Sequence, residues 1–191
     1  MIKTYMRKLL NVFKGTKGFT LIELLVVIGI LGILAAALIA TIDPFEQLKK
    51  GRDTTTRNTT LEYLNALTRY YATHAKFPWD NAVANCNAPT TAVLLSTMKD
   101  NCTDALEDEG ELKVGFGAAV DSSGVDDLIK IKTSAAGSAN VTLCFSPTAK
   151  SIKSEDATKY DNSCSGVTPP GCATSALRLA AADGTCWQEF K

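Results

Sequence analysis

The residues from Phe19 to Ile42 form an apolar run of 24 that contains one charged side chain, Glu23. As a helix, this run would extend about 36 Å at about 1.5 Å per residue, which is enough to cross a hydrocarbon core of about 30 Å. The rest of the chain is polar and rich in Thr, Ser, Asp and Asn. The run therefore predicts one membrane-spanning helix, and it excludes an ordinary cytosolic globular protein.

The charges on the two sides of the run predict its orientation. Residues 1–18 contain five basic side chains and no acidic one, whereas residues 19–191 contain 15 basic and 20 acidic ones. A short basic segment beside a span stays in the cytoplasm, so the chain after Ile42 is expected outside it. The net charge of the chain is zero and no basic cluster lies outside residues 1–18, so no nucleic-acid partner is expected.

The helical pattern continues beyond the apolar run. Pro44 removes a backbone donor and predicts a bend or a local break at that point. Apolar side chains then recur at spacings of three and four, as in an amphipathic helix; they are Leu61, Leu64, Leu67 and Tyr71. Phe77-Pro78 ends the pattern by about residue 75. One long helix is expected, half of it in the membrane and half amphipathic outside.

After Pro78 the pattern changes to short segments. Alternation over residues 112–120 predicts a half-buried strand, and two further strands are expected at 128–133 and 141–146. Asp183-Gly184, between residues 176–182 and 185–190, predicts a hairpin. The fold class that follows is α+β: a long N-terminal α-helix, transmembrane and then amphipathic, carrying a small antiparallel β-sheet head with disulfides.

Three further segments of the head carry weaker patterns. Residues 90–99 are expected to form a short helix, residues 104–111 an acidic loop, and residues 154–173 a loop rich in Ser, Thr, Asp and Pro. The acidic groups could supply oxygen ligands to calcium. They have no recognisable ligand spacing, however, so a solvated acidic loop is the favoured interpretation and no metal site is predicted.

The junction before the apolar run reads KGFTLIELL, from Lys17 to Leu25. It resembles the class III signal of type IV pilins and of the pseudopilins of type II secretion. In that family a dedicated membrane peptidase cuts after the glycine, and the new N-terminal Phe is methylated. The resemblance therefore implies cleavage after Gly18, methylation of Phe19 and a requirement for Glu23 in assembly. It covers roughly residues 15–80.

The family also implies a function and its partners. The expected protein is a structural subunit, a prepilin, of a type IV pilus-like filament, with a type II secretion pseudopilin as the alternative. Its partners would be the prepilin peptidase/N-methyltransferase, other copies of itself and related pilins, an inner-membrane assembly platform and the membrane. It would lie in the bacterial inner membrane with its C-terminal domain outside the cytoplasm, and then in an extracellular or periplasmic filament.

The expected organisation of the chain has four parts. Residues 1–18 are a cleaved basic leader, and residues 19–42 are the transmembrane and assembly helix. Residues 43–77 continue that helix in amphipathic form, and residues 78–191 are a disulfide-stabilised α+β head domain.

Two features of the apolar run suggest contacts with neighbouring subunits. A lone carboxylate inside a membrane is energetically costly, so a positively charged partner is expected for Glu23. The resemblance to the family suggests that this partner is the N-terminal amine of Phe19 on a neighbouring subunit. The alternative is that Glu23 simply reaches the membrane surface. Gly32, Ala36 and Ala40 form a small-residue stripe that permits close helix packing; the alternative is a generic span in which Gly and Ala are common.

Two other functional classes compete with this interpretation. Ala35-Ala36-Ala37 would suit a secretory cleavage site that releases a soluble protein, but the apolar run continues past it and Glu23 interrupts it. A membrane-anchored enzyme would need a catalytic constellation. His74 is the only histidine, and no CxxC, Gly-x-Ser-x-Gly or phosphate loop is present. Neither an enzyme nor a cofactor is therefore expected.

The cysteines follow the apolar run and are even in number, which indicates disulfides in an oxidising compartment; they are Cys86, Cys102, Cys144, Cys164, Cys172 and Cys186. Six cysteines allow 15 pairings, so the sequence leaves the connectivity open. The favoured set joins Cys86 to Cys102, Cys164 to Cys172 and Cys144 to Cys186. The resemblance to pilins likewise leads one to expect a disulfide-tied C-terminal segment.

Overall fold

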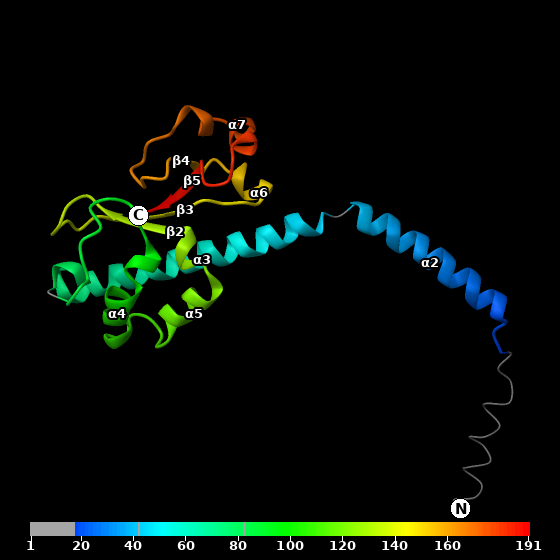
Figure 1. The fold of residues 1–191 in the computed structure, drawn as a ribbon, viewed down its shortest axis with the longest axis horizontal. Helices are drawn as coiled ribbons and strands as arrows, with labels where there is room; N and C mark the ends of the chain where they lie inside the picture. The colour runs from blue at the N-terminus through cyan, green and yellow to red at the C-terminus, as the bar shows by residue number, and fades with distance from the viewer. Residues whose placement is uncertain (1–17, 42, 82) are drawn as a thin grey trace, which may run out of the picture. The chain divides into compact units, whose positions relative to one another are not determined.

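The computed structural model describes residues 18–41, 43–81 and 83–191 (Figure 1). The predicted leader therefore lies outside the described residues, apart from Gly18, and so does Ile42. The chain divides into two compact units, residues 1–43 and 44–191, which are described separately. The fold is α+β, with an apolar N-terminal helix and an antiparallel sheet, as the sequence predicts.

Helix α2 (Leu21–Thr41) is the apolar helix of the first unit, and none of its residues is buried. Helix α3 (Pro44–His74) opens the second unit. Pro44 is its first residue, where a missing backbone N–H leaves no hydrogen bond unmade. The structure thus has two helices, α2 and α3, where the sequence predicts one long helix with a bend or local break at Pro44.

The buried face of α3 is more polar than the leucine pattern suggested. Leu64 and Leu67 are buried, but Leu61 is exposed, and three polar side chains, Asp53, Thr56 and Thr60, are buried beside the aromatic ones. The threonine hydroxyls donate to the carbonyl oxygens one turn earlier, so their burial leaves no hydroxyl donor unpaired. Hydrophobic periodicity alone could not reveal this satisfied polar surface.

Five antiparallel strands form one sheet in the order β1-β2-β3-β5-β4. Their bounds are Val93–Leu94 (β1), Ile129–Thr133 (β2), Val141–Phe145 (β3), Thr158–Tyr160 (β4) and Trp187–Phe190 (β5). The strands expected at 128–133 and 141–146 are confirmed as β2 and β3. The shorter elements are η2 (Pro78–Asp80), η3 (Leu95–Thr97), η4 (Lys99–Thr103), α4 (Asp104–Asp108), α5 (Phe116–Ser123), η5 (Asp126–Leu128), α6 (Lys150–Lys153), η6 (Pro170–Cys172) and α7 (Ser175–Ala180).

The sheet is covered on both faces. Leu143 and Phe145 of β3 and Ile129 and Ile131 of β2 belong to the main core, which also contains the buried aromatic and leucine side chains of α3. Cys144, between the two β3 core residues, points to the other face and joins a small second cluster with Cys164 and Trp187. Alternate residues of one strand therefore serve two different layers.

Two predictions between Cys86 and Glu111 are wrong. Residues 90–99 are not a short helix: Val93 and Leu94 pair with β2 as an edge strand, and a 3₁₀ turn follows. Residues 104–111 are not simply a loop, since α4 occupies most of them. Residues 93–94 form a strand because they pair with β2, and a strand of two residues is too short to show a periodic pattern in the sequence.

The strand expected over residues 112–120 is also wrong, because this segment leads into helix α5. Gly115 precedes the helix at φ +86° and Gly124 follows it at φ +64°, conformations that favour glycine. The carboxylate of Glu107 accepts hydrogen bonds from the backbone N–H groups of Gly115 and Gly117, at 2.7 and 2.8 Å. A carboxylate from a different element thus caps the first turn, which alternation within the segment could not show.

The last predicted segments need two corrections. The loop expected at 154–173 contains strand β4, and residues 176–182 are not a hairpin strand but lie largely in α7. Thr174 caps α7 through its hydroxyl, which accepts from the N–H of Leu177. Strand β5 pairs with β3 and β4 instead of with a preceding hairpin partner.

Three disulfides connect all six cysteines. Cys86–Cys102 is confirmed, but the other two predicted pairs are wrong: the structure joins Cys144 to Cys164 and Cys172 to Cys186, each with a Cα–Cα distance of 5.7 Å. Cys144 lies opposite Glu189 in the β3–β5 register. Cys186 is three residues further along that chain, roughly 10 Å at about 3.4 Å per residue, which is beyond the reach of a disulfide.

Candidate functional site

Helix α2 presents a continuous apolar surface. Its large side chains are exposed in its own unit, for example Leu21 at 82% and Ile33 at 72%. Among the described residues it is the one helix long and apolar enough to cross a membrane. An apolar helix that buries nothing in its own unit requires an apolar environment from elsewhere, which a bilayer or other apolar helices would supply.

The first turn of α2 is closed by a reciprocal pair of polar residues. The backbone N–H and the hydroxyl of Thr20 both donate to Oε2 of Glu23, at 2.8 and 2.9 Å. The backbone N–H of Glu23 donates in return to Oγ1 of Thr20, at 3.2 Å. This is a capping box, which pairs backbone donors that a helix start otherwise leaves free. The sequence carries a local signal for this cap, Thr-x-x-Glu directly before an apolar run.

The capping box changes how Glu23 should be understood. Its carboxylate is hydrogen-bonded within its own helix and also lies at the positive end of the helix dipole. A negative charge at the start of an apolar helix is therefore locally stabilised before any neighbouring subunit is met. A charged partner from a neighbour would add to this arrangement or would replace part of it.

Gly18 and Phe19 precede α2 and are exposed. A Cβ atom added at Gly18 would meet nothing within 4 Å. The described part of the chain therefore places no steric demand for glycine at this position. A protein that binds the segment, such as a protease with a narrow site, would supply such a demand.

The small-residue stripe of Gly32, Ala36 and Ala40 lies on the exposed surface of α2. A Cβ at Gly32 would also meet nothing within 4 Å, so the stripe is open to an approaching helix. At the end of α2, the hydroxyl of Thr41 donates to the carbonyl of Leu38 at 2.7 Å. This bond supplies a donor to one of the last-turn carbonyls, which have no partner further along the helix.

In the second unit, two carboxylates of α3 hold the segment that starts α6. The buried carboxylate of Asp53 accepts hydrogen bonds from the backbone N–H groups of Thr148 and Ala149, both at 2.7 Å, and from the Thr148 hydroxyl at 3.0 Å. Two turns earlier on the helix, Glu46 accepts from the backbone N–H of Lys150. The N-terminal half of α3 is thereby attached to the C-terminal part of the head.

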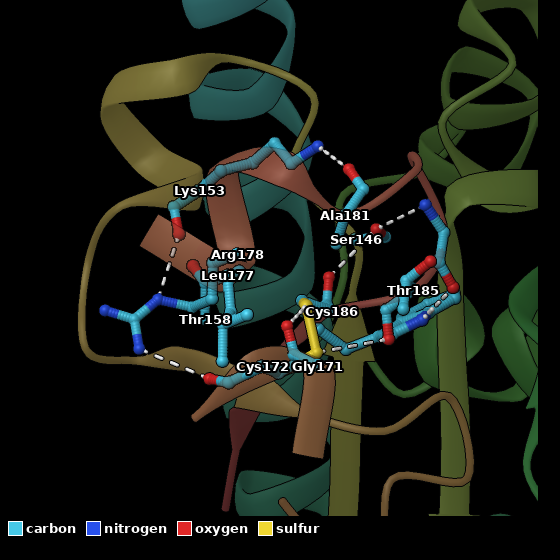
Figure 2. Close-up of a disulfide and its surroundings, with 12 residues drawn as sticks. Ser146, Lys153, Thr158, Gly171, Cys172, Leu177, Arg178, Ala181, Thr185 and Cys186 are labelled. Carbon is cyan, nitrogen blue, oxygen red and sulfur yellow. Dashed lines mark hydrogen bonds between the residues drawn. A yellow bond between two sulfur atoms is a disulfide. The ribbon is translucent and has the colours of Figure 1, made fainter. Parts of the chain in front are cut away.

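A buried arginine organises the C-terminal disulfide segment, as Figure 2 shows. The Arg178 side chain, from α7, donates to the backbone carbonyls of Lys153 at 3.2 Å, Cys172 at 3.3 Å and Ser154 at 2.9 Å. Its fourth partner is the carboxylate of Asp156, at 2.9 Å. One guanidinium therefore connects α7 to the end of α6 and to the Cys172–Cys186 disulfide.

Further hydrogen bonds attach the same segment to the sheet and to α6. The Lys153 ammonium donates to the carbonyl of Ala181 at 2.7 Å, and the Ser146 hydroxyl donates to the carbonyl of Cys186 at 3.0 Å (Figure 2). Gly184, at φ +86°, donates its N–H to the Ser146 hydroxyl at 3.0 Å. The segment is thus held at several points as an ordered surface of the head.

The residues weighed for catalysis have structural surroundings. The ring of His74 stacks on Tyr70 with centroids 4.2 Å apart, and its Nδ1 lies 2.8 Å from the hydroxyl of Thr73. Among the residues searched, no three metal-binding side chains come together. Burial raises the pKa of Tyr63 to about 12, although its hydrogen bond to Thr103 acts in the opposite direction. These groups contribute to the packing around α3.

Comparison with known proteins bears on the N-terminal segment first. Residues 13–39 match the family model of the prokaryotic N-terminal methylation motif. Two proteins of Neisseria gonorrhoeae, each named type IV major pilin protein PilE1, are 36% identical over 124 residues and 34% identical over 126 residues. Each alignment covers 61% of this chain, and they cover 64% and 59% of the two relatives, less than two thirds of their length. No solved structure gives a significant match.

An apolar α2 that lies largely within the methylation motif, followed by α3 and a disulfide-bonded antiparallel sheet, defines a pilin-like protein. The motif and the identity to the two major pilins support membership of the type IV pilin family.

Proposed function

We propose that this chain is the precursor of a type IV pilus subunit, held in the inner membrane by α2 and assembled into a filament after cleavage between Gly18 and Phe19. The observation that carries the proposal is α2 itself, an apolar helix with no buried residue, most of which lies within the matched methylation motif. Such a surface is stable in a bilayer, and it is equally suited to a core made of identical apolar helices.

Cleavage supplies the chemistry that assembly needs. It removes the five basic side chains of residues 1–18 and creates an amine at Phe19. That amine is the positive partner proposed for Glu23 of a neighbouring subunit. Gly32, Ala36 and Ala40 then allow the helices to approach closely in the core, while the head forms the outer surface.

Insertion, cleavage and assembly are separate steps under this proposal. Before cleavage, the basic leader keeps the N-terminus on the cytoplasmic side and the disulfide-bonded head on the other. A prepilin peptidase/N-methyltransferase would process the junction, and an inner-membrane assembly platform would extract the subunit into the filament. Pro44, at the start of α3, is the position at which the helical path would bend.

The deciding experiment is to isolate sheared surface filaments and determine the N-terminus and intact mass of this protein within them. We expect a mature chain that begins at Phe19 and carries one methyl group. The Gly18→Glu variant should remain uncleaved, because a charged and bulky side chain would not fit a glycine site. A mature N-terminus at Leu38, after the Ala triplet, would overturn the proposal in favour of a secreted protein.

The same preparation distinguishes a pilus from the alternative, a type II secretion pseudopilus. The similarity to two major pilins supports the pilus. Long filaments on the surface of cells at native expression would support it further. Processed protein that stays in the cell envelope, together with a secretion defect in cells lacking the gene, would support the pseudopilus instead.

A further inference from the structure

Two adjoining hollows form a groove along one side of α3. The larger, of about 580 Å³, lies between the C-terminal half of α3 and the start of β3, with Leu64 and Tyr71 in its wall. The smaller, of about 330 Å³, is lined in part by Lys132 of β2. Asn140, Thr142 and Lys191 line both hollows, so the two are continuous.

Two lysine side chains, Lys132 and Lys191, line the groove. The side chain of Lys132 has no hydrogen bond or ion pair among the described residues. Lys191 has one partner, the buried carboxylate of Glu189, at 3.8 Å. A half-buried lysine without a partner is the kind of group that an acidic side chain from another molecule would stabilise.

The opposite charge lies on a different side of the same helix. Asp104 and Asp108 of α4 are exposed and one turn apart, which places them on the same face. They line a third hollow, of about 420 Å³, together with Tyr70. Within the part of the chain that the structure describes, neither carboxylate has a hydrogen bond or an ion pair.

The geometry of α3 separates the two surfaces. Tyr70 faces the acidic hollow and Tyr71 faces the groove, and consecutive residues of an α-helix point about 100° apart. In Figure 1, α4 lies on one side of α3, and the sheet and the C-terminus lie on the other. One head therefore presents unpartnered acidic groups on one side and a lysine-bearing groove on the other.

From this arrangement we propose that the groove receives α4 of a second copy of the chain, with Lys132 and Lys191 facing the partner copy's acidic helix. Complementary patches on different sides of one molecule make a head-to-tail contact, which repeats along an open helical assembly unless the rotation between copies closes it into a ring. The inference rests on the proposed filament function and adds to it a specific contact between heads. The charges would select the register, while the helices in the core supply most of the buried apolar area.

A charge swap in the full-length protein tests the contact. Lys132→Glu and Asp108→Lys are each expected to lower the yield of sheared filaments by at least about tenfold, because each places like charges together. The double variant Lys132→Glu/Asp108→Lys restores the opposite charges and should return the yield to within about threefold of wild type. Lys159→Glu, on β4 and outside the groove, makes the same change in net charge and should have no effect.

Two measurements keep the outcome decisive. Cleavage and the unfolding midpoint of the detergent-extracted precursor must match the wild type in each single variant, which excludes a defect of folding or processing. Wild-type filament yield from Lys132→Glu, or a double variant no better than the single ones, would overturn the contact and leave the filament function intact. Absence of filaments from the wild-type chain would instead overturn the proposed function, and the contact with it.

Discussion

The carboxylate of Asp53 and the residue Thr148 are joined twice, although they lie 95 positions apart in the chain. Asp53 accepts from the Thr148 backbone N–H at 2.7 Å and from its hydroxyl at 3.0 Å. Asp53 is 4% exposed, and it also accepts from the N–H of Ala149. A single buried carboxylate thus aligns α3 with the segment that leads into α6.

Removing this carboxylate should destabilise the head. Asp53→Ala leaves buried backbone donors without an acceptor, so we expect the free energy of unfolding to fall by about 1–3 kcal/mol. Glu62→Ala, at an exposed position of the same helix, should change it by no more than about 0.5 kcal/mol. Denaturant unfolding of the full chain in detergent, followed by the fluorescence of Trp79 and Trp187, measures both. Equal midpoints for the two variants would contradict the role given to Asp53.

Two substitutions at Glu23 separate the capping box from the charge. Glu23→Gln can still accept from the N–H of Thr20, because glutamine also closes a capping box, but it has no charge. Glu23→Val removes both. If the charge pairs with the amine of Phe19 on a neighbour, both variants should be cleaved normally and neither should form filaments.

The control is Thr20→Val, which removes the hydroxyl of the capping box and keeps the carboxylate. Filament yield and cleavage are measured separately, by shearing and by the mass of the extracted protein. Filaments at wild-type yield from Glu23→Gln would mean that capping, and not charge pairing, is what Glu23 contributes. Filaments from Glu23→Val would show that apolar packing alone is sufficient.

The partners of Arg178 differ greatly in burial, so their loss should differ in cost. Arg178→Met removes the donors of three backbone carbonyls in a site where the arginine is 1% exposed. We expect a loss of at least about 3 kcal/mol in the free energy of unfolding. Asp156→Asn should leave the unfolding midpoint unchanged, because that carboxylate is fully exposed. A large effect of Asp156→Asn would show that the ion pair, rather than the carbonyl contacts, holds the segment.

The burial of the Tyr63 phenol should make the folded protein less stable at alkaline pH. Burial raises its pKa to about 12 in the folded protein, against about 10 in an unfolded chain. Below a pH of about 10 the folded and unfolded states both keep the phenol proton, so the contribution of Tyr63 to the free energy of unfolding is fully present. Between the two values the unfolded state releases the proton first, so stability falls with rising pH, by up to about 1.4 kcal/mol per unit.

Tyr63→Phe is the matched control for this titration. It removes the ionisable group, although it also leaves the hydroxyl of Thr103 without its tyrosine partner. That lost bond lowers stability by the same amount at every pH. The difference in unfolding free energy between wild type and variant should therefore shrink as the pH rises from 10 to 12. Parallel pH profiles would show that Tyr63 is not protected from ionisation.

The N-terminal third of the protein could be interpreted from sequence because its signals are local. An uninterrupted apolar run with one carboxylate is visible without any tertiary contact, and so is the Gly18-Phe19 junction. The capping box of Thr20 and Glu23 is also local, because the whole motif lies within four consecutive residues. Strands β2 and β3 were found from local pattern as well: β2 alternates regularly over five residues, and β3 does so in its first three.

In the head, the structure depends on residues that are distant in sequence. Residues 116–123 became a helix, with Glu107 of another element accepting from backbone N–H groups at its start. Two disulfide pairings were decided by the register of β3 with β5, which separates Cys144 from Cys186. The buried Asp53 and Arg178 likewise have partners supplied by other elements. An apolar helix and an expected processing junction can be predicted from the sequence alone, because both depend on local composition. Only the tertiary structure decided which polar groups and cysteines meet, because those contacts form when distant segments pack against one another.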